Sequence, residues 1–177
     1  IAPTNNGMLA KLISFVGLAS HAGGSPHTGI NALNAAMIAL SAIHAQRETF
    51  KEEDSIRIHP IITRGGLAVS SVPSDVRIET FVRGSNIDAI IDASEKVDRS
   101  LKAGAFAIGA DVNIVTLPGY LPIVTDTNLQ NIYIENAKRL VGSENVVTMK
   151  HRTGSTDMGD LSQIMPVIHP YVGAATG

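Results

Sequence analysis

The sequence contains no cysteine. This absence excludes a disulfide framework, a thiolate metal site and a cysteine nucleophile, and it suits a reducing compartment, so we predict a cytoplasmic location. No run of about 18 apolar residues occurs and no charged-then-apolar signal pattern opens the chain, so we expect no membrane-spanning segment. An initiator methionine is also missing. We therefore interpret the chain as a piece of a longer polypeptide.

An excess of charge of either sign is lacking as well. The formal net charge is -2, with 17% charged and 44% hydrophobic residues, which is ordinary for a globular chain. There is no basic excess for nucleic acid and no acidic tail, so the expected partner is a small organic substrate or another protein. A length of 177 residues allows one domain with a sizeable core and an incomplete second unit.

The hydrophobic pattern of residues 9–118 predicts an alternation of strands and helices. Apolar residues repeat at helical spacing in two segments and at strand spacing in four others. The expected strands are 12–20, 56–63, 76–83 and 112–116, and the expected helices are 29–47 and 87–109. Right-handed crossovers in a βαββαβ order give a four-stranded antiparallel sheet with both helices on one face. The predicted fold is therefore an α+β, ferredoxin-like domain.

Residues 119–177 have a different character. A Pro- and Gly-rich linker at 118–122 precedes an expected helix at 128–141 and a short expected strand at 146–149. The Gly-rich turn 154–160 then leads into another helix. This part is too short and too discontinuous for an independent domain, so we interpret it as an incomplete α/β segment.

His21 is the strongest candidate for a functional side chain. It lies where the first strand passes through a Gly- and Pro-containing turn into a helix, a position from which side chains reach ligands. An exposed imidazole there can donate a hydrogen bond to a developing oxyanion, although a purely structural turn histidine is the alternative. His27 is better explained by local capping and packing beside Thr28, the expected helix cap. His44 and His59 are expected to be structural.

Two further candidates suit a carboxylate or an oxyanion. Arg83 closes the third strand, and its guanidinium could hold a carboxylate through two parallel N–H donors; a solvated edge charge is the alternative. Gly154, Ser155 and Thr156 place free backbone N–H groups and two hydroxyls before an expected helix. An ordinary Ser/Thr cap would give the same pattern.

A metal site built from this chain alone is not expected. His151, Asp157, Asp160 and His169 are possible ligands, but their spacing fits no zinc motif. Two carboxylates near a helix start are more often partners of the helix dipole.

Several motifs, taken in order, resemble one family over essentially all 177 residues. They are Gly17–Gly23 with Pro26 and Gly29–Leu33, Gly65–Gly66, Val72–Pro73, Val82–Gly84, Lys96–Arg99, Ala103–Ala105, Thr116–Pro122, Gly154–Ser162 and His169–Tyr171. This series resembles the dimerisation (lid) domain and adjoining catalytic segment of di-zinc amidohydrolases and metallopeptidases. That family includes aminoacylases, glutamate carboxypeptidases, auxin-conjugate hydrolases and aminobenzoyl-glutamate hydrolase.

The resemblance implies a two-lobed enzyme in which lid domains pair to form a homodimer. Two divalent metal ions, zinc or manganese, would activate a water that attacks the amide bond of an N-acyl amino acid or dipeptide-like substrate, with a glutamate as general base. His21 would act in the partner's active site, Arg83 would hold the substrate carboxylate, and Gly154–Thr156 would line the pocket. Ser70 stands where the family pattern has an asparagine, so it is expected to contact substrate.

The resemblance also assigns the metal ligands of the family to segments outside this sequence. The chain alone is therefore expected to bind no metal and to be inactive. Residues 9–118 would be the lid and residues 119–177 a part of the catalytic domain. The alternative hypothesis is a stand-alone ferredoxin-like module that dimerises or senses amino acids without catalysis.

Overall fold

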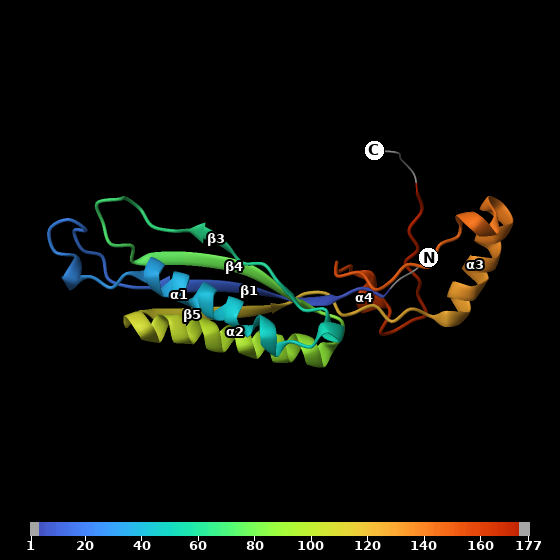
Figure 1. Cartoon of the computed structure of the whole chain (residues 1–177), viewed down its shortest axis with the longest axis horizontal. Coiled ribbons are helices and arrows are strands. Elements are labelled where there is room, and N and C mark those ends of the chain that lie inside the picture. The colour runs from blue at the N-terminus through green and yellow to red at the C-terminus, as the bar shows by residue number, and fades with distance from the viewer. Residues whose placement is uncertain (1–3, 174–177) are drawn as a thin grey trace.

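The computed structural model describes residues 4–173 and shows an elongated molecule, with a layered sheet and two helices at one end and a looser segment at the other (Figure 1). The strands are β1 (Gly7–Val16), β2 (Arg57–Ile58), β3 (Ile61–Arg64), β4 (Asp75–Gly84) and β5 (Asp111–Pro118). The α-helices are α1 (Ala32–Ala45), α2 (Ile87–Ile108), α3 (Thr127–Val141) and α4 (Met158–Leu161). Short 3-10 turns occur at Pro26–Thr28, Gln46–Thr49, Glu52–Asp54 and Ser143–Asn145.

The sheet confirms the ferredoxin-like prediction. Its strands run β2-β4-β1-β5, β3 also pairs with β4, and every pair is antiparallel. β2 and β3 share one edge of β4, because Arg57 pairs with Arg83 and Ile61 with Glu79. The single strand expected at 56–63 is thus divided in two at Pro60, which has no N–H to donate to the ladder. The sheet has five strands instead of four for this reason.

Two boundaries near the first strand differ from the prediction. β1 begins at Gly7 and ends at Val16, earlier than the expected 12–20. Helix α1 is capped by Asn31, whose Oδ1 accepts hydrogen bonds from the backbone N–H of Leu33 at 2.9 Å and of Asn34 at 3.0 Å. Thr28, the expected cap, lies in the preceding 3-10 turn. An asparagine side chain satisfies the free N–H groups of a first turn as well as threonine does.

Helices α1 and α2 cover one face of the sheet and enclose the core. The buried cluster combines strand residues such as Phe15, Val76 and Ile78 with small residues of the helices. α1 contributes mainly alanines, and these face Gly104 of α2. A Cβ at Gly104 would lie 2.5 Å from the carbonyl oxygen of Ala35 and 2.6 Å from the backbone nitrogen of Ala39. The two helices therefore touch at backbone distance, and a side chain would not fit between them.

A buried lysine connects the sheet to α2. Lys11 is fully buried on the helix-covered face, where its Nζ donates to Asp98 Oδ1 at 2.6 Å and to Thr116 Oγ1 at 2.9 Å. A buried ammonium is tolerated only when it is paired and hydrogen-bonded. These contacts hold β1, β5 and α2 in one arrangement.

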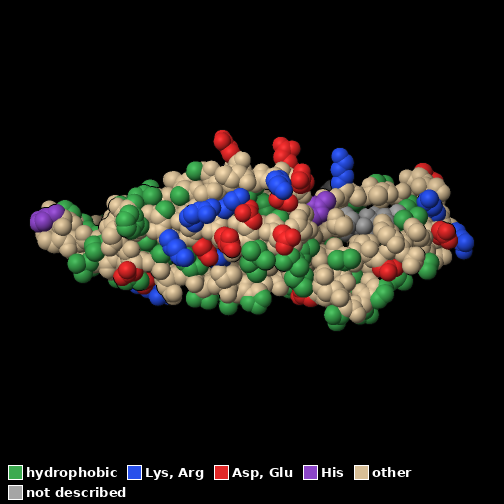
Figure 2. Space-filling model, turned by 90° about the horizontal axis from the view of Figure 1, so that it is seen from below, with side chains coloured by type: hydrophobic (Ala, Val, Ile, Leu, Met, Phe, Trp, Pro, Cys, Tyr) green, Lys and Arg blue, Asp and Glu red, His purple; other side chains and the backbone are tan. Residues whose placement is uncertain are grey.

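The outer surface of the helical layer is that of a solvated face. Acidic and basic side chains are interspersed there (Figure 2). No helix within residues 4–173 is long and apolar enough to cross a membrane.

The C-terminal segment is held less firmly. Helix α3 buries none of its residues, and only a few apolar side chains in this segment, such as Ile123 and Val167, are buried. The strand expected at 146–149 is wrong: these residues follow a 3-10 turn and join no sheet. Valines alone do not form a strand without a neighbouring strand to pair with. The segment is attached to the start of β1, where Asn6 N–H donates to Arg152 O at 3.1 Å and Arg152 N–H donates to Thr4 O at 2.9 Å.

Substituting Gly104 tests the contact between α1 and α2. Gly104→Val should lower the free energy of unfolding by about 1–3 kcal/mol, because overpacked side chains force the backbone apart. The matched control is Ala103→Val, which places the same side chain on the exposed surface of α2. Urea denaturation followed by circular dichroism measures both. Equal midpoints for the two variants would contradict the close contact.

Candidate functional site

The His21 turn fixes the tautomer of its imidazole. Nδ1 accepts hydrogen bonds from the backbone N–H of Gly24 at 2.8 Å and of Gly23 at 3.2 Å. A backbone N–H can only donate, so Nδ1 of the neutral ring carries no proton and Nε2 carries it. The side chain is exposed. His21 therefore presents a single N–H donor to whatever approaches this end of the sheet, which is the geometry an oxyanion needs.

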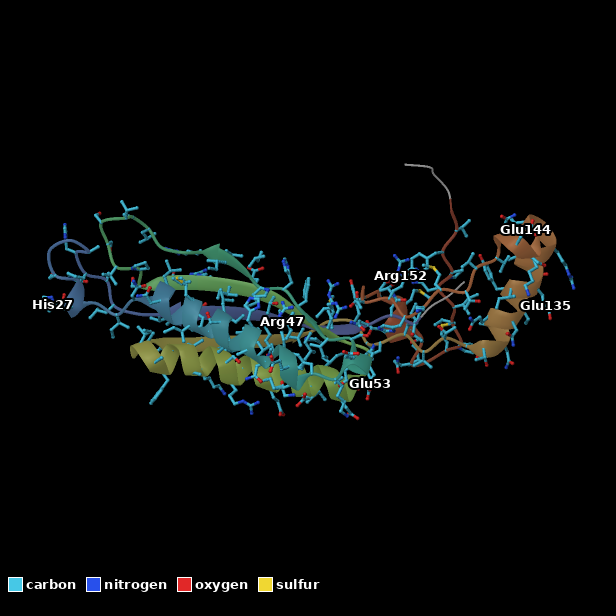
Figure 3. All side chains as sticks on the ribbon, viewed as in Figure 1. His27, Arg47, Glu53, Glu135, Glu144 and Arg152 are labelled. Carbon is cyan, nitrogen blue, oxygen red and sulfur yellow. The ribbon has the colours of Figure 1, made fainter. Side chains whose placement is uncertain are left out.

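Ser70 lies beside this turn. The Ala22 N–H donates to Ser70 O at 2.9 Å, and the Val72 N–H donates to Ser20 O at 2.9 Å. The structure therefore brings His21 and Ser70 together, and the Ser70 side chain is exposed. Figure 3 shows His27, from the same loop, at one extreme of the molecule.

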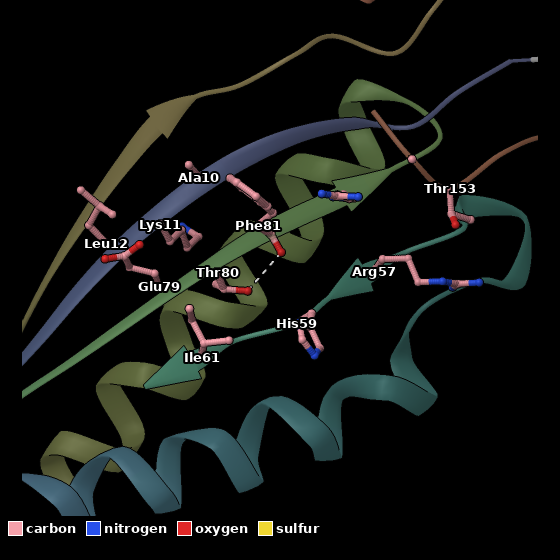
Figure 4. Close-up of a pocket in the computed structure, with 12 residues that line it drawn as sticks. Ala10, Lys11, Leu12, Arg57, His59, Ile61, Glu79, Thr80, Phe81 and Thr153 are labelled. Carbon is pink, nitrogen blue, oxygen red and sulfur yellow. Dashed lines mark hydrogen bonds between the residues drawn. The ribbon is translucent and has the colours of Figure 1, made fainter. Parts of the chain in front are cut away.

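Arg83 lies toward the opposite end of β4, on the sheet face that the helices do not cover. A pocket of about 620 Å³ is present there, within the range of small-molecule sites (Figure 4). Its floor consists of open-face side chains on neighbouring strands, and Thr153 and Gly154 of the C-terminal segment also line it. In register, Arg83 pairs with Arg57, Phe81 with Ala10, and Glu79 with both Ile61 and Leu12.

The guanidinium groups of Arg57 and Arg83 are available for an anion. Arg57 donates to the neighbouring Ile56 carbonyl at 2.9 Å, and the Arg83 Cζ lies 5.3 Å from the centroid of the Phe81 ring. In the described part of the chain, neither group forms an ion pair with a carboxylate. Two guanidinium groups at one end of a concave surface, neither paired with a carboxylate of the described residues, suit a carboxylate ligand.

Only Gly154 of the predicted Gly154–Thr156 group lines this pocket. Ser155 has a buried Oγ without a hydrogen-bond partner among the described residues, and Thr156 Oγ1 donates to Asp157 Oδ1 at 3.2 Å. The helix that follows, α4, has only four residues. The dipole of so short a helix is too weak to support the anion site expected at its start.

The predicted site residues thus form two groups, one at each end of β4. His21 makes an isolated bridge with Ser71, just before β4, whereas Arg83 lies near its end. The eight residue steps from Asp75 to Arg83 span about 26 Å at the rise of an antiparallel strand. Within one chain His21 and Arg83 therefore cannot contact the same small substrate.

The possible metal ligands are engaged separately. Asp160 Oδ1 accepts the Leu121 N–H at 2.9 Å, and His169 packs against the Tyr171 ring with centroids 5.1 Å apart. Among residues 4–173 there is no group of three or more His, Cys, Asp or Glu side chains that could hold a metal ion.

His151 joins the C-terminal segment to the start of β1. Its Nε2 lies 2.7 Å from Asn6 Oδ1 and its Nδ1 lies 2.9 Å from Thr4 Oγ1. Asn6 Nδ2 donates to Ser55 O, so its Oδ1 is the acceptor and His151 Nε2 carries the proton. Burial lowers the pKa of His151 from its ordinary value of 6.5.

The sequence interpretation missed the remaining groups of the pocket. His59 was expected to be structural, and Arg57 was not singled out, yet both line the pocket with Glu79 and Phe81. The alternation of side chains along the expected strand 76–83 places Glu79, Phe81 and Arg83 on one face. Pairing the strand at 56–63 against them in register would have added Arg57 and His59.

Residues 4–107 match the family model described as "Peptidase dimerisation domain". The chain belongs to this family. The dimerisation domain and its adjoining segment are 31% identical over 163 residues to the Xaa-Arg dipeptidase of Mus musculus, an alignment that covers 90% of this chain and 37% of the relative. The chain thus spans little more than a third of the length of that relative.

Solved structures share the fold. Aminopeptidase PepT from Bacillus cereus superposes with a TM-score of 0.72 at 18% identity, covering 94% of this chain and 43% of the other. The aminobenzoyl-glutamate utilization protein from Klebsiella pneumoniae superposes with a TM-score of 0.67 at 20% identity, covering 91% and 43%. The relative is named as a dipeptidase and the matching family model as a peptidase dimerisation domain, so the family resemblance seen in the motifs is confirmed.

Removing the partly buried His151 should weaken the dependence of stability on pH. Below about pH 6.5 the unfolded chain takes up a proton at His151 that the folded chain, with its lowered pKa, does not bind. The free energy of unfolding therefore falls as the pH decreases from 7.5 to 5.5, and His151→Gln should remove part of this fall. Urea midpoints across this range measure the effect.

The control for this experiment is His44→Gln, which removes an exposed histidine of α1. It should retain the wild-type dependence on pH. An unchanged slope in the His151→Gln protein would show that burial of this ring does not contribute.

Proposed function

We propose that the chain is the lid and a part of the catalytic domain of a metal-dependent hydrolase. Residues 9–118 would form the lid and residues 119–177 the catalytic part. The enzyme would cleave the amide bond of an N-acyl amino acid or a dipeptide. Membership of the peptidase dimerisation family supports this proposal, and the relative named Xaa-Arg dipeptidase makes dipeptides the first substrates to try.

The proposal of a homodimer rests on the distance between His21 and Arg83 within one chain. Each end of β4 presents half of a site: a fixed N–H donor at one end and carboxylate-binding guanidinium groups at the other. A twofold axis that relates two lids side by side in antiparallel orientation places the His21 end of one chain near the Arg83 end of its partner. Two complete sites then form for each dimer.

The residues of this chain would bind and orient the substrate. Arg83 would hold the terminal carboxylate through two N–H donors, and Gly154 would line the same pocket. The partner's His21 would donate its Nε2 proton in a hydrogen bond to the carbonyl oxygen as negative charge develops on it. Ser70 would accompany His21, and Ser155 and Thr156 would lie behind Gly154.

The metal ions would be bound elsewhere in the protein. The donors among residues 4–173 do not form a site that fits them, since Asp160 and His151 are already committed to separate hydrogen bonds. This chain aligns with 37% of the relative's length. Segments of the protein that correspond to the rest of that length would supply the metal ligands.

Heterodimers test the proposal directly. His21→Ala and Arg83→Ala should each reduce amide hydrolysis by about 100-fold or more in the full-length dimer, because each removes one half of both sites. Heterodimers of the two variants, purified through two different tags, should regain about half of the wild-type activity, because one of their two sites is complete.

The matched control is a heterodimer of wild type with the His21→Ala/Arg83→Ala double variant. If the sites are shared between chains, both of its sites lack one group and activity stays low. If each chain used its own His21 and Arg83, this control would be half active and the first heterodimer inactive. Binding of substrate without any turnover by the wild-type protein would favour a sensing module instead.

A further inference from the structure

The pocket on the open face of the sheet changes its chemistry along β4. The open-face residues of this strand that line the pocket are Glu79, Phe81 and Arg83, so an acidic side chain, an aromatic ring and a guanidinium follow one another in a row. Figure 4 labels the first two of them. The neighbouring strands reinforce the pattern. Arg57 pairs beside Arg83, whereas the apolar Ile61 and Leu12 flank Glu79. The pocket therefore has a cationic end, an apolar middle and an anionic end.

The carboxylate of Glu79 has no structural partner among the described residues. Its side chain is exposed to the pocket, and among residues 4–173 it forms no hydrogen bond or ion pair. The residues on both sides of it, Ile61 and Leu12, are apolar and offer no group that could pair with its charge. Arg83 does not neutralise it, since its guanidinium lies over the Phe81 ring.

The spacing of the two charges fits one amino-acid residue with a basic side chain. Four residue steps separate Glu79 from Arg83, or about 13 Å between their Cα atoms. The Arg83 guanidinium leans toward Phe81 and so shortens this distance, and the remaining gap to Glu79 is on the order of one extended basic side chain. A carboxylate at Arg83 and Arg57 would leave the methylene stem along the apolar residues beside Phe81, Ala10 and Ile61, and bring a terminal cation to Glu79.

We propose that Glu79 is a specificity-determining residue that binds the cationic side chain of the substrate residue whose carboxylate Arg83 holds. The proposal rests on the function proposed above and names its substrate class: dipeptides or N-acyl amino acids with a basic C-terminal residue. The contact is a charge-assisted hydrogen bond, which is about twice as strong as a hydrogen bond between neutral groups.

Binding of matched ligands separates this proposal from the hydrolase proposal. N-acetylarginine and N-acetylcitrulline have nearly the same shape, but citrulline carries no positive charge. The wild-type full-length protein should bind N-acetylarginine about tenfold more tightly by calorimetry, and Glu79→Gln should remove most of this difference. Glu95→Gln, an exposed change of the same type on α2, should retain it.

Hydrolysis of dipeptides that end in arginine or citrulline forms the second arm. A preference for arginine in kcat/KM that disappears in Glu79→Gln supports the assignment. Equal binding of the two ligands by the wild type, no binding of either, or a preference that persists in Glu79→Gln would overturn it. Glu79-dependent binding of N-acetylarginine without hydrolysis of any amide would keep the binding site and refute the hydrolase.

Discussion

The contact between α1 and α2 is the constraint on which the rest of the structure depends. Gly104 and the alanines of α1 let the two helices approach to backbone distance, so both fit on one face of the sheet. Larger side chains would push one helix outward and open the core. Because both helices lie on the same side, the opposite face stays uncovered, and its side chains are available to form a pocket rather than a second core.

The strand β4 serves both faces at once. Val76, Ile78, Thr80 and Val82 are buried on the helix-covered face, whereas the residues that alternate with them are turned to the open face. Because side chains alternate between the two faces of a strand, the ten residues of β4 supply both core residues and pocket residues. The length of the same strand also sets the distance between the His21 turn and Arg83, which is why the proposed site needs a second chain.

The sequence predicted the elements that depend on local hydrophobic pattern, but it did not predict the features that depend on pairing between distant strands. Hydrophobic periodicity identified α2 and β4 closely, and the Gly-rich turn made His21 a candidate before its hydrogen bonds were known. Pairing between distant segments was less accessible: the break at Pro60 divided one edge strand, and the expected strand at 146–149 found no partner. His59 was expected to be structural for the same reason, because its place in the pocket depends on the register of β4 with its neighbours.

The contrast between Lys11 and the arginines of the pocket shows how one fold separates structural from binding charges. Lys11 is on the covered face, where Asp98 and Thr116 satisfy it, so its charge is committed to holding β1 against α2. Arg57 and Arg83 lie on the uncovered face of the same sheet without a carboxylate partner among the described residues. A buried charge must be paired for the protein to fold, whereas a charge at a pocket can stay unpaired in the ligand-free protein because water solvates it. The face on which a cation lies therefore decides whether it stabilises the fold or binds a ligand.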